Sequence, residues 1–134
     1  MARLILDTTV LIAAERARLG LAEAVGDEDD VAIAAVTAAE LVVGVELADA
    51  RRKVRRKAFV EAVLKEVRVE PYDVDTARAH ATLLAYTRRS GRSRGAHDLL
   101  IAATAITTAR RLITADATGF ADLPGVEVQV LGVN

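Results

Sequence analysis

Short apolar runs alternate with longer amphipathic segments along most of the chain, and this alternation limits the possible folds more than any other feature. Strands separated by helices pair in parallel, with helices covering both faces of the sheet. The sequence therefore predicts an α/β fold with a mainly parallel sheet. The predicted strands are residues 2–6, 31–36, 68–70, 111–114 and 126–131, and the predicted helices are 11–21, 37–50, 51–67, 73–89 and 97–109.

The composition is that of a globular domain. A chain of 134 residues predicts one domain, 1–134, and 52% of its residues are hydrophobic and 28% charged. The absence of cysteine excludes disulfides, thiolate metal sites and thiol catalysis. Neither a signal peptide pattern nor an apolar run of about 18 residues is present. We therefore expect a soluble, cytoplasmic protein that does not bind membranes.

Charge is strongly segregated, although the formal net charge is only -1. The acidic run 27–30 predicts an exposed turn. In the segment 51–57, six of seven residues are basic. On a helix such a run usually forms a solvated face, and the alternative is contact with RNA or with an acidic partner.

Four acids occupy equivalent places in the predicted fold. Asp7 and Asp116 each follow a strand, whereas Glu40 and Asp98 lie in the first turns of helices. Each has a local explanation: a helix cap for Asp7, a capping box with Thr37 for Glu40, a favourable helix dipole for Asp98 and a turn for Asp116. In a parallel sheet, however, these positions share one edge. Four carboxylates placed together repel one another unless they bind cations, so the pattern predicts a site for a divalent ion such as Mg²⁺.

Other catalytic sites have little support in the sequence. We expect His80 to be a surface or partly buried helix residue, and His97, beside Asp98, to have a structural or supporting role. No Gly-x-Ser-x-Gly elbow and no glycine-rich phosphate loop follow a strand. A metal-activated water is therefore the expected nucleophile.

Four segments together carry a family resemblance. The chain resembles the PIN-domain family and, more narrowly, the VapC-type toxins of toxin–antitoxin pairs, over essentially its whole length and in the family's order. The segments are Leu4-Ile5-Leu6-Asp7-Thr8-Thr9, Thr37-Ala38-Ala39-Glu40-Leu41, His97-Asp98-Leu99-Leu100-Ile101-Ala102-Ala103-Thr104-Ala105, and Thr114-Ala115-Asp116 with Phe120 and Leu123-Pro124-Gly125-Val126.

The resemblance implies a three-layer α/β/α sandwich and an endoribonuclease that uses Mg²⁺ or Mn²⁺ and leaves a 5′-phosphate and a 3′-hydroxyl. It implies that Thr9 supports the first acid of the site. The chain departs from the family at Gly119, where many relatives carry an acid or a polar residue. The acidic quartet carried over from the family is Asp7, Glu40, Asp98 and Asp116.

The resemblance also implies partners: RNA as substrate, a second copy in a homodimer, and a cognate antitoxin that fills an apolar groove and covers the acids. Helices within 37–67 are the candidates for that groove. The loop preceding Asp98 is rich in arginine, glycine and serine, which suits contacts with RNA phosphates, although an ordinary solvated loop is the alternative. The expected RNA-binding residues are Arg89, Arg92 and Arg94.

Three alternatives remain open. A PIN nuclease can process RNA without being a toxin, and a PIN fold that lacks catalysis can bind RNA or protein, although all four acids are present here. The third alternative is a magnesium-dependent receiver domain of a signalling system. Such a domain needs a lysine after a late strand, and the lysines of this chain lie elsewhere, at Lys53, Lys57 and Lys65.

Overall fold

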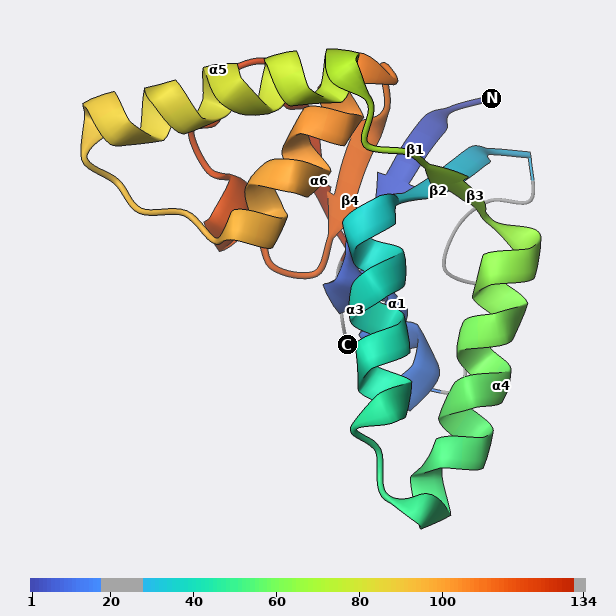
Figure 1. Ribbon diagram of the computed structural model, residues 1–134. Coiled ribbons are helices and arrows are strands. Elements are labelled where there is room, and N and C mark those ends of the chain that lie inside the picture. The colour runs from blue at the N-terminus through green and yellow to red at the C-terminus, as the bar shows by residue number, and fades with distance from the viewer. Residues whose placement is uncertain (18–27, 132–134) are drawn as a thin grey trace.

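Five parallel strands form one sheet in the computed structural model, which describes residues 1–17 and 28–131 (Figure 1). The strand order is β3-β2-β1-β4-β5. The chain adds β2 and β3 on one side of β1, and then β4 and β5 on its other side, so β1 pairs with both β2 and β4 and the topological switch point lies there. An open parallel sheet binds ligands outside its carboxyl ends at such a switch point. The strands are β1 (Arg3–Leu6), β2 (Asp30–Ala34), β3 (Arg68–Glu70), β4 (Arg111–Thr114) and β5 (Val128–Val130).

Alternate side chains of β1 divide the core into two layers. Leu4 and Leu6 pack with α1 (Thr8–Arg16), α3 (Ala35–Glu46) and α4 (Ala50–Glu66) on one face. Ile5 packs with α5 (Val74–Ser90) and α6 (Ala96–Thr107) on the other. The predicted three-layer α/β/α arrangement is confirmed. A receiver domain has the strand order 2-1-3-4-5, so the order found here rules out that alternative.

The capping box predicted at Thr37 is wrong. Helix α3 begins at Ala35, directly after β2 leaves its pairing with β3, and the cap at Ala34 makes no side-chain hydrogen bond. Thr37 therefore lies inside the helix and is fully buried. Helix α1 also begins earlier than expected, at Thr8, because the Asp7 side chain accepts a hydrogen bond from the amide of Val10.

The acidic run is not one continuous turn in the described residues. Strand β2 begins at Asp30, where the carboxylate pairs with Arg3 at 2.8 Å and with Arg110 at 3.0 Å, so this acid belongs to the sheet. Position 27 and the last part of the predicted helix 11–21 lie outside the described residues. The loop expected at 115–125 contains a short 3₁₀ helix, η1 (Ala117–Phe120).

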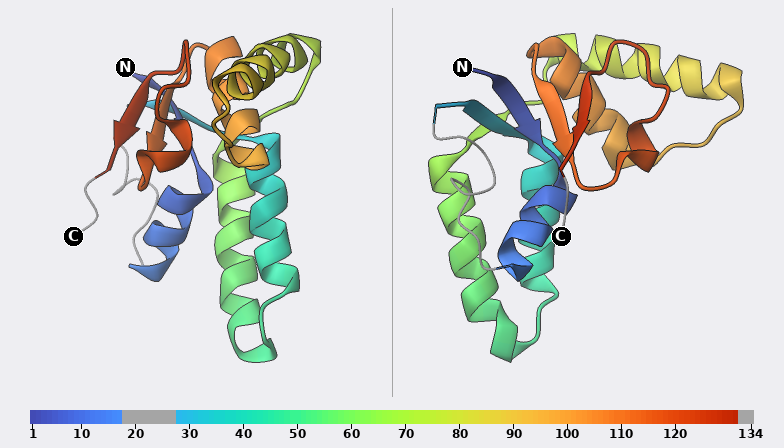
Figure 2. Two further views of the ribbon diagram at one scale, coloured as in Figure 1. Left: turned by 90° about the vertical axis from the view of Figure 1, so that its left-hand side faces the viewer. Right: turned by 180° about the vertical axis from the view of Figure 1, so that it is seen from behind.

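Helices α3 and α4 lie side by side and project beyond the sheet, as all three views show (Figures 1 and 2). The apolar face predicted for 51–67 is therefore wrong in its first half. Val54 is 78% exposed, and only the second half of α4, including Val60 and Val63, reaches the core. Within the described ranges, no helix is both long and apolar enough to cross a membrane.

Candidate active site

Asp7 follows the carboxyl end of β1, at the switch point. The residue is only 3% exposed, and its carboxylate is held by hydrogen bonds. Its Oδ1 accepts hydrogen bonds from the Thr9 hydroxyl at 2.6 Å and from the Val10 amide at 3.3 Å. Its Oδ2 accepts one from the Thr114 hydroxyl at 2.5 Å. Asp7 therefore both caps α1, as the local explanation predicted, and presents a fixed carboxylate with Oδ2 only partly used.

Thr114, at the end of β4, is a site residue that the sequence analysis missed. Its hydroxyl donates a hydrogen bond to Asp7 and accepts one from the backbone amide of Asp116 at 3.1 Å. The available signal was a hydroxyl residue at the end of a strand, two positions before a candidate acid. Thr9 is the predicted support of the first acid, and its hydroxyl donates a hydrogen bond to Asp7.

Glu40 projects from α3 toward the start of α1 and toward α6. Its Oε1 accepts a hydrogen bond from the Thr8 hydroxyl at 3.0 Å, and its Oε2 lies 3.4 Å from His97 Nδ1. Thr8 is a second site residue that the sequence analysis missed. His97 contacts an acid of the site from outside it, which agrees with the expected supporting role, whereas His80 lies partly buried on α5 and contacts the Tyr72 hydroxyl.

Asp98 lies in the first turn of α6, as predicted, and is partly buried. Burial raises the pKa of its carboxyl, and the charges of Asp7, Glu40 and Asp116 raise it further. The other three predicted acids therefore lie near enough to Asp98 for their charges to act on it. The charge of His97 acts in the opposite direction and lowers the pKa of Asp98.

Asp116 is exposed and caps η1. Its Oδ1 accepts hydrogen bonds from the Thr118 hydroxyl at 2.6 Å and from the Thr118 amide at 3.0 Å, and these bonds lower the pKa of the carboxyl. Two acids of the quartet thus differ: Asp116 is stabilised as an anion by its own turn, whereas Asp98 is not.

The donor set suits a hard divalent cation. Carboxylate oxygens are the preferred ligands of Mg²⁺ and Mn²⁺. Within the described residues, the arginines form their ion pairs with other acids, and no lysine or arginine pairs with these four. In the described part of the chain, however, no three acidic or histidine side chains already lie close enough together to form an assembled metal site. The four acids offer the oxygen ligands that a divalent cation prefers, but their carboxylates do not converge on one point in this conformation.

The predicted RNA-binding loop is tied to the segment that follows η1. Arg92 pairs with Asp122 at 2.8 Å, and Arg94 donates to the carbonyl oxygen of Ala121 at 2.9 Å. Arg89 is exposed near the end of α5. Arg94 therefore anchors the loop, while the side chains of Arg89 and Arg92 reach solvent.

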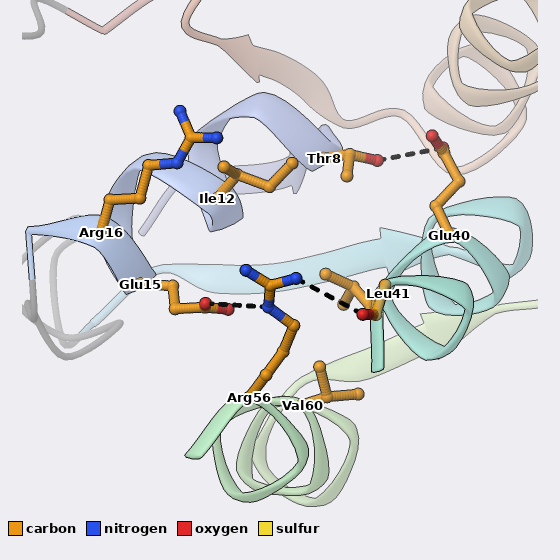
Figure 3. A pocket seen from close by; sticks show the side chains of 9 residues that line it. Thr8, Ile12, Glu15, Arg16, Glu40, Leu41, Arg56 and Val60 are labelled. Atoms are coloured by element: carbon orange, nitrogen blue, oxygen red, sulfur yellow. Dashed lines mark hydrogen bonds and ion pairs between the residues drawn. The ribbon is translucent and has the colours of Figure 1, made fainter. Parts of the chain in front are cut away.

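A cavity of about 140 Å³ adjoins Glu40 between α1, α3 and α4 (Figure 3). Arg56 crosses it, with Nε 3.2 Å from Glu15 Oε1 and Nη1 3.4 Å from the carbonyl oxygen of Gly44. One residue of the basic run 51–57 thus points inward, which the prediction of a solvated face missed. The cavity is lined by Thr8, Ile12, Glu15, Arg16, Glu40, Leu41, Gly44, Arg56 and Val60.

Comparisons with known proteins agree with this geometry. The family model of the PIN domain matches residues 4–126. The chain is 42% identical to ribonuclease VapC5 of Mycobacterium tuberculosis, over 96% of this chain and 94% of that protein, and 30% identical to ribonuclease VapC of Rickettsia bellii, over 93% of each.

Solved structures give the same result. The crystal structure of VapBC-5, a toxin–antitoxin system from M. tuberculosis, superposes with a TM-score of 0.76 at 36% identity, covering 99% of this chain and 100% of that chain. VapBC2 of Rickettsia felis, bound to promoter DNA, shares the fold with a TM-score of 0.87 at 20% identity, over 97% of this chain and 99% of that chain. The chain therefore belongs to the PIN-domain family and, within it, to the VapC ribonucleases of toxin–antitoxin systems.

Proposed function

We propose that this protein is a toxin endoribonuclease that hydrolyses RNA phosphodiester bonds with the help of Mg²⁺ or Mn²⁺. The observation that carries the proposal is geometric: the partly buried carboxylate of Asp98 lies near enough to Asp7, Glu40 and Asp116 that their charges, together with burial, raise the pKa of its carboxyl. Anionic groups gathered without a lysine or arginine at the carboxyl edge of a parallel sheet favour binding of a cation. Membership of the VapC ribonucleases supports RNA as the substrate.

The proposed cation ligands are Asp7, Asp98, Glu40 and Asp116. When bound, a divalent ion supplies an activated water and positive charge for the phosphoryl oxygens. The protein supplies the orientation of the ligands. Thr9 and Thr114 fix the two oxygens of Asp7, and Thr8 fixes Glu40. RNA phosphates would contact the exposed arginines Arg89 and Arg92, which flank the start of the loop that leads to Asp98, with Arg94 holding the loop.

We also propose that a cognate antitoxin covers this site. Related toxins have been solved as VapBC complexes, including those of M. tuberculosis and R. felis. The cavity next to Glu40 lies between α1 and the two helices named as groove candidates, and exposed apolar residues such as Val43 and Leu47 continue along α3 and its C-terminal end. An inhibitory segment would place apolar side chains there and a basic one at the acids.

A homodimer is the remaining part of the proposal. The surface around β3 and the start of α5 carries exposed large apolar residues and is separate from the proposed antitoxin surface on α3 and α4. These residues are Val69, Tyr72 and Val74. Sedimentation equilibrium on the antitoxin-free protein tests this part separately. A monomer at all concentrations would contradict it.

Incubation of the antitoxin-free protein with total cellular RNA tests the proposed activity. We expect discrete cleavage with Mg²⁺ or Mn²⁺, no cleavage with EDTA, and none with Asp98→Asn. Asp75→Asn is the matched control, because Asp75 is also a first-turn acid but belongs to α5. Equal cleavage in the presence of EDTA would contradict metal dependence, and no cleavage by the folded, metal-supplied protein would contradict the nuclease.

A further inference from the structure

Gly119 lies directly against the carboxylate of Asp98. A Cβ atom at position 119 would be 2.1 Å from Asp98 Oδ2 and 2.9 Å from Asp98 Cγ, both closer than real Cβ contacts. The nearest atoms around that imagined Cβ all belong to Asp98. Any side chain at 119 would therefore occupy the space that the Asp98 carboxylate now fills.

The backbone does not explain this glycine. The glycines of the described residues that have a positive φ are Gly91 and Gly125, so the conformation of Gly119 is open to other residues. The glycine leaves space for the Asp98 carboxylate in the position that it has here.

A second glycine flanks the same oxygen. Gly95 precedes α6 with a φ of −59°, which any residue can adopt, and a Cβ there would lie 3.1 Å from Asp98 Oδ2. Two glycines from separate segments thus surround one carboxylate oxygen, and neither is required by its own backbone. Asp98 receives no hydrogen bond from the described residues that would fix it as Thr9 and Thr114 fix Asp7.

We propose that Gly119 is a positioning residue for Asp98. Its missing side chain, together with that of Gly95, defines where the Asp98 carboxylate lies relative to the other three acids. Contact with backbone on two sides restricts a carboxylate that has no hydrogen-bond donor to orient it. The consequence for metal binding rests on the proposed function, whereas the position of the carboxylate does not.

The test compares Gly119→Ala with Gly44→Ala. The control also adds one methyl group, but its nearest neighbour is Arg56 Cδ at 3.9 Å, an ordinary contact. Gly119→Ala should weaken Mn²⁺ binding, measured by calorimetry, by about 10- to 100-fold, the range for residues that orient metal ligands. The melting temperature of metal-free protein should change little, because the end of a flexible side chain can move aside.

The Asp98→Asn background separates positioning from a general structural effect. If Gly119 acts through Asp98, then Gly119→Ala should not weaken Mn²⁺ binding further once Asp98 is already Asn. An equal additional loss in that background would overturn the proposal. So would Mn²⁺ binding by Gly119→Ala as tight as, or tighter than, that of Gly44→Ala.

A metal-free measurement keeps the test independent of the proposed function. The ¹³Cγ chemical shift of Asp98 reports the surroundings of its carboxylate, and it should move in Gly119→Ala but not in Gly44→Ala. If the wild type bound no Mn²⁺, the proposed function would fail while the shift still tested the positioning role. An unchanged Asp98 shift in Gly119→Ala would overturn that role.

Discussion

Carboxylates near the amino ends of the strands and near their carboxyl ends, here called the amino edge and the carboxyl edge of the sheet, have opposite electrostatic surroundings. At the amino edge, the buried guanidinium of Arg110 pairs with Asp30 at 3.0 Å and donates to the carbonyl oxygens of Leu4 and Asp30. It also pairs at 3.4 Å with Glu70, which is the last residue of β3. At the carboxyl edge, hydroxyl groups donate to Asp7, Glu40 and Asp116, and no guanidinium contacts any of the four acids within the described residues.

The pKa shifts express this difference. Hydrogen bonding to Arg110 lowers the pKa of Asp30, whereas burial and neighbouring anions raise the pKa of Asp98. The amino edge is a neutralised structural cluster, and the carboxyl edge is left anionic. Carboxylates that are kept without a protein counter-charge are candidates for function rather than stability. Substitutions at the two edges should therefore have different consequences.

The largest effect on activity is expected at the carboxyl edge. Asp98→Asn and Asp7→Asn should each lower RNA cleavage by at least about 100- to 1,000-fold, since each removes a charge that acts directly at the reacting centre. Circular dichroism should show a retained fold. Turnover in either variant equal to that of Asp75→Asn would contradict the assignment.

The largest effect on stability is expected at the amino edge. Arg110→Met should lower the free energy of unfolding by about 1–3 kcal/mol, because the buried Glu70, the partly exposed Asp30 and the carbonyl oxygen of Leu4 lose a donor. Urea denaturation measures this, and Arg111→Met is the matched control, since that arginine is exposed and pairs with an exposed Glu127. If both variants were equally stable, the amino edge would not be a stabilising cluster.

Removal of the Thr114 hydroxyl tests whether hydrogen bonds to the acids at the carboxyl edge matter for metal binding. Thr114→Val keeps the shape of the side chain but removes the donor to Asp7 Oδ2, so Mn²⁺ affinity should fall by about 10- to 100-fold. Thr87→Val is the control, because Thr87 is also buried but its hydroxyl donates within α5. Equal Mn²⁺ affinities of the two variants would show that orientation of Asp7 does not matter.

Asp98 and Asp30 should contribute to the pH dependence of stability with opposite signs. Because the folded-state pKa of Asp98 is raised, ionisation costs stability as pH rises from the unfolded value of about 3.9 through the folded value. In metal-free buffer, Asp98→Asn should therefore melt above the wild type at neutral pH, and the gap should close in acid.

For Asp30 the sign reverses. Its folded-state pKa is lowered, so its contribution is present above the unfolded pKa and is lost as pH falls through the folded value. Asp30→Asn should melt below the wild type at neutral pH, with a gap that narrows in acid. Differences of the same sign for Asp30→Asn and Asp98→Asn would break the comparison.

The smallest effect is expected from the arginine loop. Replacing Arg92 and Arg94 together by Gln should weaken RNA binding and lower the slope of log affinity against log salt by about 1–2. The control replaces Arg51 and Arg52, which are exposed on α4. A salt slope equal to that of the wild type would reject contact between the loop and RNA.

The parallel sheet and the location of all four acids could be predicted because periodicity and strand ends are local features of a sequence. The contacts of the acids could not. The bond from Thr114 to Asp7 depends on the pairing of β4 with β1, and Glu40 turns toward Thr8 because α3 begins before the expected cap. Val54 is exposed because its helix extends past the sheet, which no local pattern indicates.

Calorimetric titration of the metal-free protein with Mn²⁺ tests the central claim most directly, with wild type, Asp98→Asn and Asp75→Asn measured side by side. The carboxyl-edge account predicts saturable binding by the wild type and by Asp75→Asn, weakened by more than about 10-fold in Asp98→Asn. Binding of equal strength in all three proteins, or none in the wild type, would contradict the claim that this edge of the sheet holds a catalytic cation.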